Sequence, residues 1–220
     1  MIFIPIKTGK ITDNIFAIKA MMVNMFVIKD GNNVICIDTG FGGYIVKKGL
    51  KNLNIDPNTV SHVFLTHSDY DHAGCIGLFK NASIFLSKNE GQMINGKKSR
   101  AFGIKYNSPI KREYCLLNND EVVQAGNISV RGFETPGHTP GSMSYLVNDE
   151  YLFVGDSMAL IRNKAYNFPF FINMDTKTQK ESIRKLSGLK DVEMMFTAHS
   201  GYTNDFVSAM KAWRKVEPCK

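Results

Sequence analysis

Aspartate and histidine residues follow five apolar segments of this 220-residue chain. Four of its five histidines lie in these places; His62 is the exception, and we expect it at the surface or at a strand edge. Taken alone, each residue has an ordinary explanation, such as a hydrogen-bonded loop histidine or an aspartate that caps a helix. Together they indicate a metal site, because imidazoles and carboxylates are ligands of zinc and other first-row cations. The positions are Asp38 after residues 34–37, the segment His67–His72 after 63–66, His138 after 128–137, Asp156 after 151–155, and His199 after 194–198.

The elements that must position these residues are short strands and single helices. Hydrophobic periodicity predicts strands over 2–7, 14–19, 23–29, 34–37, 63–65, 83–86, 128–134, 143–147, 151–154 and 193–196, and helices over 44–53, 73–79, 175–186 and 204–216. Residues 30–33 read as a hairpin turn, and 88–118 as a helix followed by a lid loop. Runs of strands that alternate with single helices predict an α/β sandwich in which helices cover two sheets.

Length and composition bound the possibilities. The length favours a single domain over residues 1–220, and 44% hydrophobic with 21% charged residues is typical of a globular chain. The net charge of +7 is spread along the sequence, so a solvated surface explains it better than a nucleic-acid site. No apolar run suits a membrane span, the first residues make a poor signal peptide, and the four cysteines lie far apart. A reduced, cytoplasmic protein with a small-molecule substrate and no membrane partner is expected.

The ordered set of acids and histidines resembles that of the metallo-β-lactamase fold hydrolases. That family has an acid after an early strand, an HxHxDH segment, and then separate His, Asp and His residues, matched here by Asp38, His67–His72, His138, Asp156 and His199. The phrases at 23–26, 135–142 and 197–201 resemble the small glyoxalase II-like and lactonase-like members. The resemblance implies a four-layer αββα sandwich with two divalent metal ions at one edge, zinc first and iron or manganese as alternatives.

Carried over by position, the resemblance also assigns roles. His67 and His138 would bind the first metal, with Asp156 as the bridge and Asp38 as a supporting group that orients the ligand loop. The ligands of the second metal would be Asp71, His72 and His199, of which Asp71 and His72 are the candidate catalytic residues beside the metal-bound hydroxide.

One position departs from the family pattern, because Asp69 replaces the second histidine and gives HxDxDH. Either the first site has lost a ligand and the enzyme is mononuclear or impaired, or Asp69 itself binds. We favour binding, because in the family that histidine coordinates through Nδ1, which is attached to Cγ as the aspartate oxygens are. Each metal would then have two imidazoles and one carboxylate of its own, with Asp156 shared. The harder ligand set also favours iron or manganese more than the all-histidine version does.

Two adjacent cations lower the pKa of a shared water to about 7 and polarise a carbonyl. We therefore expect hydrolysis of a small ester, lactone or thioester. Two alternatives stay open: a di-iron redox protein that needs a separate electron donor, and a phosphodiesterase or nuclease. Candidate substrate contacts are Tyr202, Met22 and Phe168, and further pocket walls are expected from Met21, Tyr166, Phe170, Phe171 and the surroundings of Phe102 and Tyr106.

Overall fold

The computed structural model describes residues 4–100, 103 and 105–214. Within these residues the strands form a seven-stranded sheet, a six-stranded sheet and a two-stranded ribbon. The first sheet contains, in spatial order, β1 (Gly9–Lys10), β2 (Ile15–Ala20), β3 (Val23–Asp30), β4 (Asn33–Ile37), β5 (His62–Phe64), β6 (Ser83–Ser87) and β7 (Cys115–Leu117). The second contains β15 (Tyr202–Thr203), β14 (Met194–Phe196), β11 (Tyr151–Phe153), β10 (Met143–Val147), β9 (Ile128–Glu134) and β8 (Glu121–Ala125). The ribbon pairs β12 (Met158–Ile161) with β13 (Lys164–Asn167).

The helices are short apart from two. The α-helices in the described part of the chain are α1 (Gly43–Asn52), α2 (Tyr70–Ala73), α3 (Gly91–Ile94), α4 (Thr176–Ser187) and α5 (Phe206–Ala209). Single 3-10 turns lie at Pro57–Thr59, Ile76–Leu78 and Lys88–Glu90. None of the described helices is long and apolar enough to cross a membrane.

The core between the two large sheets is built from large side chains of both. Phe64 of β5 is fully buried and its ring lies 5.4 Å from that of Tyr145 of β10. The hydroxyl of Tyr145 donates a hydrogen bond of 2.8 Å to the carbonyl oxygen of Leu65. The sheets are therefore fastened to each other immediately before the segment that begins at His67.

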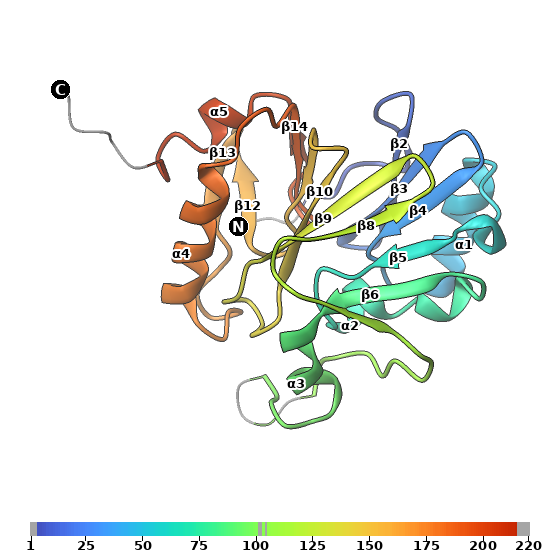
Figure 1. The fold of residues 1–220 in the computed structure, drawn as a ribbon, viewed down its shortest axis with the longest axis horizontal. Helices are drawn as coiled ribbons and strands as arrows, with labels where there is room; N and C mark the ends of the chain where they lie inside the picture. The colour runs from blue at the N-terminus through green and yellow to red at the C-terminus, as the bar shows by residue number, and fades with distance from the viewer. Residues whose placement is uncertain (1–3, 101–102, 104, 215–220) are drawn as a thin grey trace.

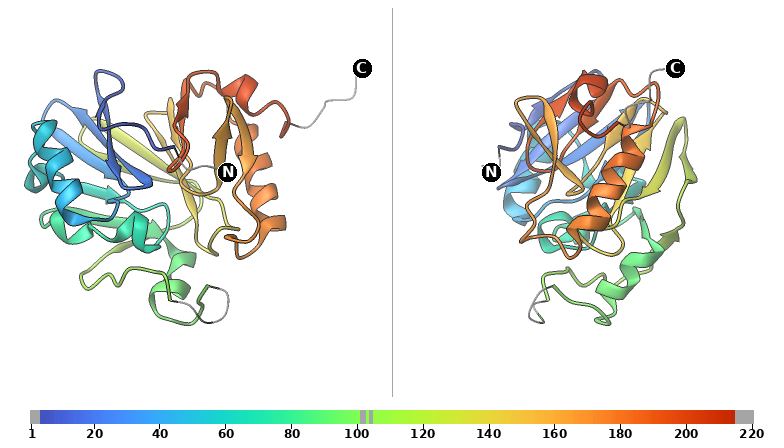
Figure 2. Two further views of the ribbon diagram at one scale, coloured as in Figure 1. Left: turned by 180° about the vertical axis from the view of Figure 1, so that it is seen from behind. Right: turned by 90° about the vertical axis from the view of Figure 1, so that its left-hand side faces the viewer.

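Two further apolar layers cover the outer faces of the sheets. Val46 and Leu50 of α1 pack against the first sheet, and Ile183 and Leu186 of α4 pack against the second. Figure 1 and the left view in Figure 2 show α1 and α4 on opposite sides of the molecule with the sheets between them. These three layers of contact give the expected αββα sandwich.

Parallel pairing brings the chemistry-bearing loops to one edge. In the first sheet β4 runs parallel to β5, with Ile37 opposite Phe64, and in the second β11 runs parallel to β14, with Phe153 opposite Phe196. The carboxyl ends of parallel strands meet at the same edge of a sheet. Asp38 and His67 therefore leave the first sheet together, and the loops with Asp156 and His199 leave the second together.

Most of the expected elements are confirmed, with four differences. The helix expected over 73–79 is wrong: α2 begins directly after Asp69 and ends at Ala73. The next residue is Gly74, where a Cβ would meet the carbonyl oxygen of Tyr70 at 2.4 Å. The closing helix is only the single turn α5 within the described residues. Residues 4–7 form no strand, and the rest of the expected first strand, residues 2–3, lies outside the described residues. Strands β1, β7, β8, β12, β13 and β15 were not expected at all, and β7 lies within 88–118, which was expected to be a helix followed by a lid loop.

Candidate metal centre

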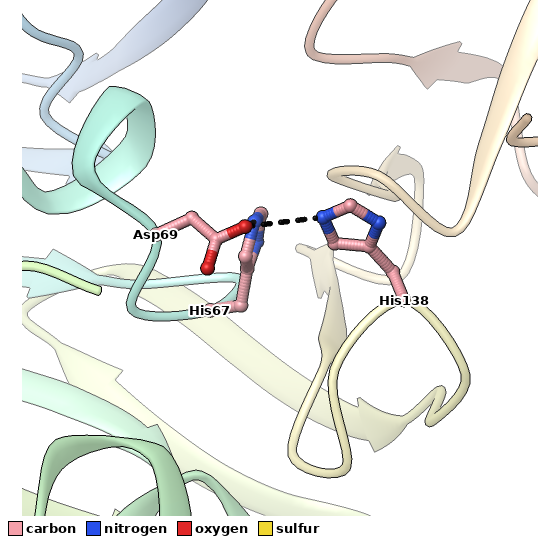
Figure 3. Close-up of side chains that lie close together, drawn as sticks. All are labelled: His67, Asp69 and His138. Atoms are coloured by element: carbon pink, nitrogen blue, oxygen red, sulfur yellow. Dashed lines mark ion pairs between the residues drawn. The ribbon is translucent and has the colours of Figure 1, made fainter. Parts of the chain in front are cut away.

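Three side chains from two loops form the first cluster. Asp69 Oδ2 lies 3.5 Å from Nε2 of His67 and 3.4 Å from Nε2 of His138. Figure 3 shows His67 and Asp69 on the loop after β5, with His138 facing them from the loop after β9. All three are buried. The aspartate that replaces the family's histidine therefore points at the same place as the two imidazoles.

A second cluster lies beside the first. Asp71 Oδ2 is 3.7 Å from Nε2 of His72 and 3.5 Å from Nε2 of His199. Asp156 joins the two clusters, because its Oδ2 lies 3.3 Å from Nε2 of His138 while its Oδ1 lies 3.4 Å from His72 and 3.1 Å from His199. One carboxylate thus turns one oxygen towards each cluster.

The spacing and the missing partners both fit metal ions. Two nitrogen or oxygen ligands of a tetrahedral zinc ion are about 3.3 Å apart, given bonds of about 2.0 Å. The distances of 3.1–3.7 Å bracket this value. Several buried side-chain atoms of the cluster residues have no hydrogen-bond partner, although buried polar atoms almost always have one. In the described residues these are Nε2 of His67, Oδ1 of Asp69, Nε2 of His72 and Oδ1 of Asp156.

Hydrogen bonds from the far side of each ring turn the Nε2 atoms towards the clusters. Nδ1 of His72 lies 2.8 Å from Oδ2 of Asp38, and Nδ1 of His199 lies 2.6 Å from the carbonyl oxygen of Met22. Nδ1 of His138 lies 3.3 Å from Oδ1 of Asn173. Because these partners are acceptors, each Nδ1 carries the proton and each Nε2 keeps its lone pair for a cation.

Asp38 supports both clusters. Besides His72, its carboxylate accepts hydrogen bonds from the backbone N–H of Thr66, at 2.8 Å, and from the Thr66 hydroxyl. That hydroxyl lies 3.1 Å from Nδ1 of His67. Asp38 itself sits in the left-handed region at φ 58°, which aspartate and asparagine tolerate better than most residues. The supporting role expected for Asp38 therefore rests on a direct contact to His72 and on an indirect one to His67 through the Thr66 hydroxyl.

The ionisation of the site favours cation binding. Burial alone would raise the pKa of Asp156, but His199, His72 and His138 hold it well below its usual value. Burial lowers the pKa of His72, yet Asp156, Asp38 and Asp71 more than reverse this and raise it. Asp156 thus stays ionised, and a metal ion would replace the protonated imidazoles as its positive partner.

A carboxylate that the sequence did not single out fastens the two loops of the first cluster. Glu90, at the end of the 3-10 turn 88–90, is fully buried. One of its oxygens accepts hydrogen bonds from the backbone N–H and the hydroxyl of Ser68, at 2.8 and 2.6 Å, and the other accepts from the hydroxyl of Thr139 at 2.7 Å. Ser68 lies between His67 and Asp69, and Thr139 follows His138, so Glu90 fixes the distance between these ligand loops.

The two clusters open into a cavity of about 560 Å³. Its walls are largely apolar, with a few polar groups on the side of the metal centre. The residues that line it are Met22, Asp69, Asp71, Ser99, Arg100, Tyr106, His138, Asp156, Phe168, Phe171, Ile172, Asn173, Met174 and His199. Of the expected walls, Met22, Tyr106, Phe168 and Phe171 are therefore in place.

Other expected wall residues lie elsewhere. Tyr202 is not among the described residues that line the cavity, because it pairs in β15 and its ring lies 5.7 Å from that of Phe196. The expected substrate contact is therefore wrong for this cavity. Met21, Tyr166 and Phe170 are exposed and do not line it either, and Phe102 lies outside the described residues. His62 stays apart from the clusters, as expected, but it is half-buried on β5, between β4 and β6, with its ring stacked on Phe85, and not at the surface.

Comparisons with known proteins agree with this site. The sequence pattern of the metallo-beta-lactamase superfamily matches residues 18–199. The chain is 32% identical over 157 residues to a probable metallo-hydrolase from Methanocaldococcus jannaschii, a match that covers 71% of this chain and 65% of the relative. It is 28% identical over 138 residues to a probable polyketide biosynthesis zinc-dependent hydrolase from Bacillus velezensis, covering 60% and 54%. It is 26% identical over 156 residues to an N-acyl homoserine lactonase from a Bacillus species, covering 68% and 60%.

The matched part of the chain thus spans less than two thirds of the length of these curated relatives. Among solved structures, a mutant metallo-beta-lactamase from Cronobacter sakazakii superposes with a TM-score of 0.74 at 17% identity, covering 94% of this chain and 93% of that one. At this identity the superposition establishes the fold alone.

Proposed function

We propose that this chain, which belongs to the metallo-beta-lactamase superfamily, is a metal-dependent hydrolase that cleaves a small ester, lactone or thioester. The observation that carries the proposal is the pair of buried Asp/His clusters that share Asp156 and open into an apolar cavity. Relatives described as a probable metallo-hydrolase and as a lactonase support this class of reaction.

The residues of the two clusters have separate tasks in this proposal. His67, Asp69 and His138 would hold one divalent ion, and Asp71, His72 and His199 the other, with Asp156 between them. Such ions supply an activated water as nucleophile and an electrophile for the carbonyl oxygen. We propose zinc, because two imidazoles and a carboxylate form a common catalytic zinc set and a relative is described as zinc-dependent. Asp71 and His72 act by holding their ion, with Asp38 fixing the imidazole of His72.

The cavity wall accounts for the proposed substrate class. Phe168, Phe171 and Met174 offer apolar surface that a short acyl group would bury, and they offer no cluster of cations for a phosphate. Tyr106 stands at the polar side, where burial and the carboxylates of Asp71 and Asp69 raise the pKa of its phenol. Its hydroxyl therefore keeps its proton and can donate a hydrogen bond to a substrate oxygen.

The remaining features of the proposal are a single domain over residues 1–220, a small-molecule substrate, no nucleic-acid or membrane partner, and a cytoplasmic location.

One observation favours a second candidate function. The carboxylate of Asp69 in the first cluster is a harder ligand than histidine, and a di-iron redox centre would use it well. Metal content separates the two functions, since the redox protein would contain iron after purification and would show an iron-dependent absorption band.

The test is metal analysis of protein purified without chelators and then saturated with zinc, combined with a panel of lactone, thioester and phosphodiester substrates. We expect about two ions per chain in the parent protein and about one in Asp69→Ala, because a dinuclear site loses one ion when a ligand is removed. Asp149→Ala removes an exposed acid outside the clusters and serves as the matched control. A chain that binds no zinc, or that cleaves only phosphodiesters, would refute the proposal. Unchanged stoichiometry in Asp69→Ala would remove Asp69 from the ligand set.

A further inference from the structure

Arg100 reaches into the first cluster from the loop that follows α3. One nitrogen of its guanidinium, Nη2, contacts Oδ2 of Asp69 and lies 2.6 Å from Nε2 of His138. The other, Nη1, donates hydrogen bonds to the carbonyl oxygens of His138 and Ile172, at 2.7 and 2.9 Å. The side chain is only 11% exposed, so this is a built position and not a solvated surface arginine.

The two atoms that Nη2 contacts are the same two that complete the first cluster around His67. Nδ1 of His138 faces the acceptor Oδ1 of Asn173 and carries the proton, which leaves one lone pair on Nε2. A single lone pair accepts a hydrogen bond from Arg100 or binds a metal ion, and it does not do both. Arg100 and a metal ion at the first cluster are therefore mutually exclusive in this arrangement.

The second cluster has no such cation in the described part of the chain. The ion pairs of Asp71 run to His72 and His199. Those of Asp156 run to His72, His138 and His199. An ion that enters the second cluster meets imidazoles that can give up their protons, whereas an ion that enters the first must displace a guanidinium, which cannot be deprotonated.

We propose that Arg100 is a resident cation that competes for the first metal position, so that the centre loads stepwise. The second cluster binds its ion first, and the first cluster binds one only when the guanidinium withdraws from Asp69 and His138. The inference rests on the proposed metal centre and adds an order and a difference in affinity between its two sites. Arg100 thus acts through the first cluster, by setting the order in which the two ions bind.

The test compares zinc binding by the parent chain, Arg100→Gln and Lys98→Ala. Lys98 is an exposed cation of the same loop and controls for a change in overall charge. Zinc is titrated against a chromophoric chelator, with the stoichiometry checked by elemental analysis, so that two dissociation constants are obtained for each protein. We expect the weaker constant to fall at least about tenfold in Arg100→Gln, which corresponds to about 1.4 kcal/mol. The tighter constant, and both constants of Lys98→Ala, should stay within about twofold.

An increase in zinc affinity cannot be explained by a loss of structure in Arg100→Gln. Arg100 fastens its loop to two backbone carbonyls, so its loss could loosen the fold, but a loosened site binds metal more weakly and not more tightly. Thermal unfolding of the metal-free proteins measures any such loss separately. Unchanged or weaker binding at the first site in a folded Arg100→Gln overturns the inference, as does an equal gain at both sites or in Lys98→Ala. A chain that binds no zinc in any variant overturns the proposed function instead.

Discussion

Glu90 offers a sharp test of how the site is held together. Its carboxylate accepts three hydrogen bonds inside the protein, two from Ser68 and one from Thr139, and these bonds join the loops that carry His67 and His138. We compare two substitutions. Glu90→Gln keeps the shape of the side chain and removes the charge, whereas Glu90→Ala removes the acceptors altogether.

The structure gives different magnitudes for the two variants. Hydrogen bonds to a charged group contribute about 1.5–3 kcal/mol each and are not additive, so Glu90→Ala should lower the free energy of unfolding by about 3–5 kcal/mol. In Glu90→Gln the amide oxygen can face both donors of Ser68 while the amide nitrogen faces the Thr139 hydroxyl. That hydroxyl lies 2.9 Å from the hydroxyl of Ser142 and can turn to donate there. The donors of Ser68 and Thr139 stay paired while the Ser142 hydroxyl gives up Thr139 as its acceptor, and the expected loss is about 1–2 kcal/mol.

Urea denaturation of metal-free protein measures both values, and zinc titration shows whether the first site weakens with them. Thr178→Ala, which removes a half-buried hydroxyl that donates to Asp175 at the start of α4, provides a control with a loss of ordinary size. Two results would refute this reasoning. Either Glu90→Ala is as stable as the wild type, or the alanine and glutamine variants lose the same free energy of unfolding, so that neither the charge of Glu90 nor its hydrogen bonds hold these loops.

Three other changes have expected outcomes. Gly141→Ala should destabilise the fold by about 1–3 kcal/mol in the same assay, because its Cβ would lie 2.1 Å from the backbone nitrogen of Glu90; a stable variant would contradict this. Asp38→Asn should weaken zinc binding by about 10- to 100-fold at the second site in chelator competition, since the charge behind the imidazole of His72 is lost. The first site should weaken less, because Asp38 reaches His67 only through the Thr66 hydroxyl; an equal effect at both sites would contradict this. In the metal-free fold the pKa values of His72 and His199 are raised above the ordinary value of 6.5. Protonation of these imidazoles therefore stabilises the fold at pH values below 6.5, and this stabilisation is lost as the pH rises through the raised pKa values. Zinc must displace those protons, so at fixed free zinc it should raise Tm more at pH 8 than at pH 6, and the reverse order would count against the assignment.

The sandwich and the convergence of the ligand residues could be predicted because both follow from short-range signals. Short apolar runs identified β4, β5, β9, β11 and β14, and the acid or histidine after each lies at the shared edge. Strands β12 and β13 were missed because Met158–Ile161 and Lys164–Asn167 pair only with each other and carry little alternation. The helix over 73–79 failed because Gly74 packs closely against the turn before it, a contact that periodicity does not register.

Glu90 and Arg100 could not be found from the sequence for a different reason. Neither follows an apolar strand in a recognisable motif, and each acts through side chains that are distant in the chain. For Glu90 the only signal was Gly141, since a Cβ at that position would lie 2.1 Å from the backbone nitrogen of Glu90. For Arg100 it was the small group of basic residues at 97–100. Both residues lie in the least regular stretch of the chain, so their partners are fixed by tertiary packing alone.

The division of the clusters between the two sheets has a consequence for biosynthesis. His67, Asp69, Asp71 and His72 are translated early, while Asp156 and His199 come from the last part of the chain. A nascent polypeptide therefore exposes half of a chelating set long before the other half leaves the ribosome. Any ion captured at that stage would have to be exchanged, and the finished centre can form only once residue 199 has emerged. In the mature protein the bound ions would then link the ligand loops of the first sheet to those of the second.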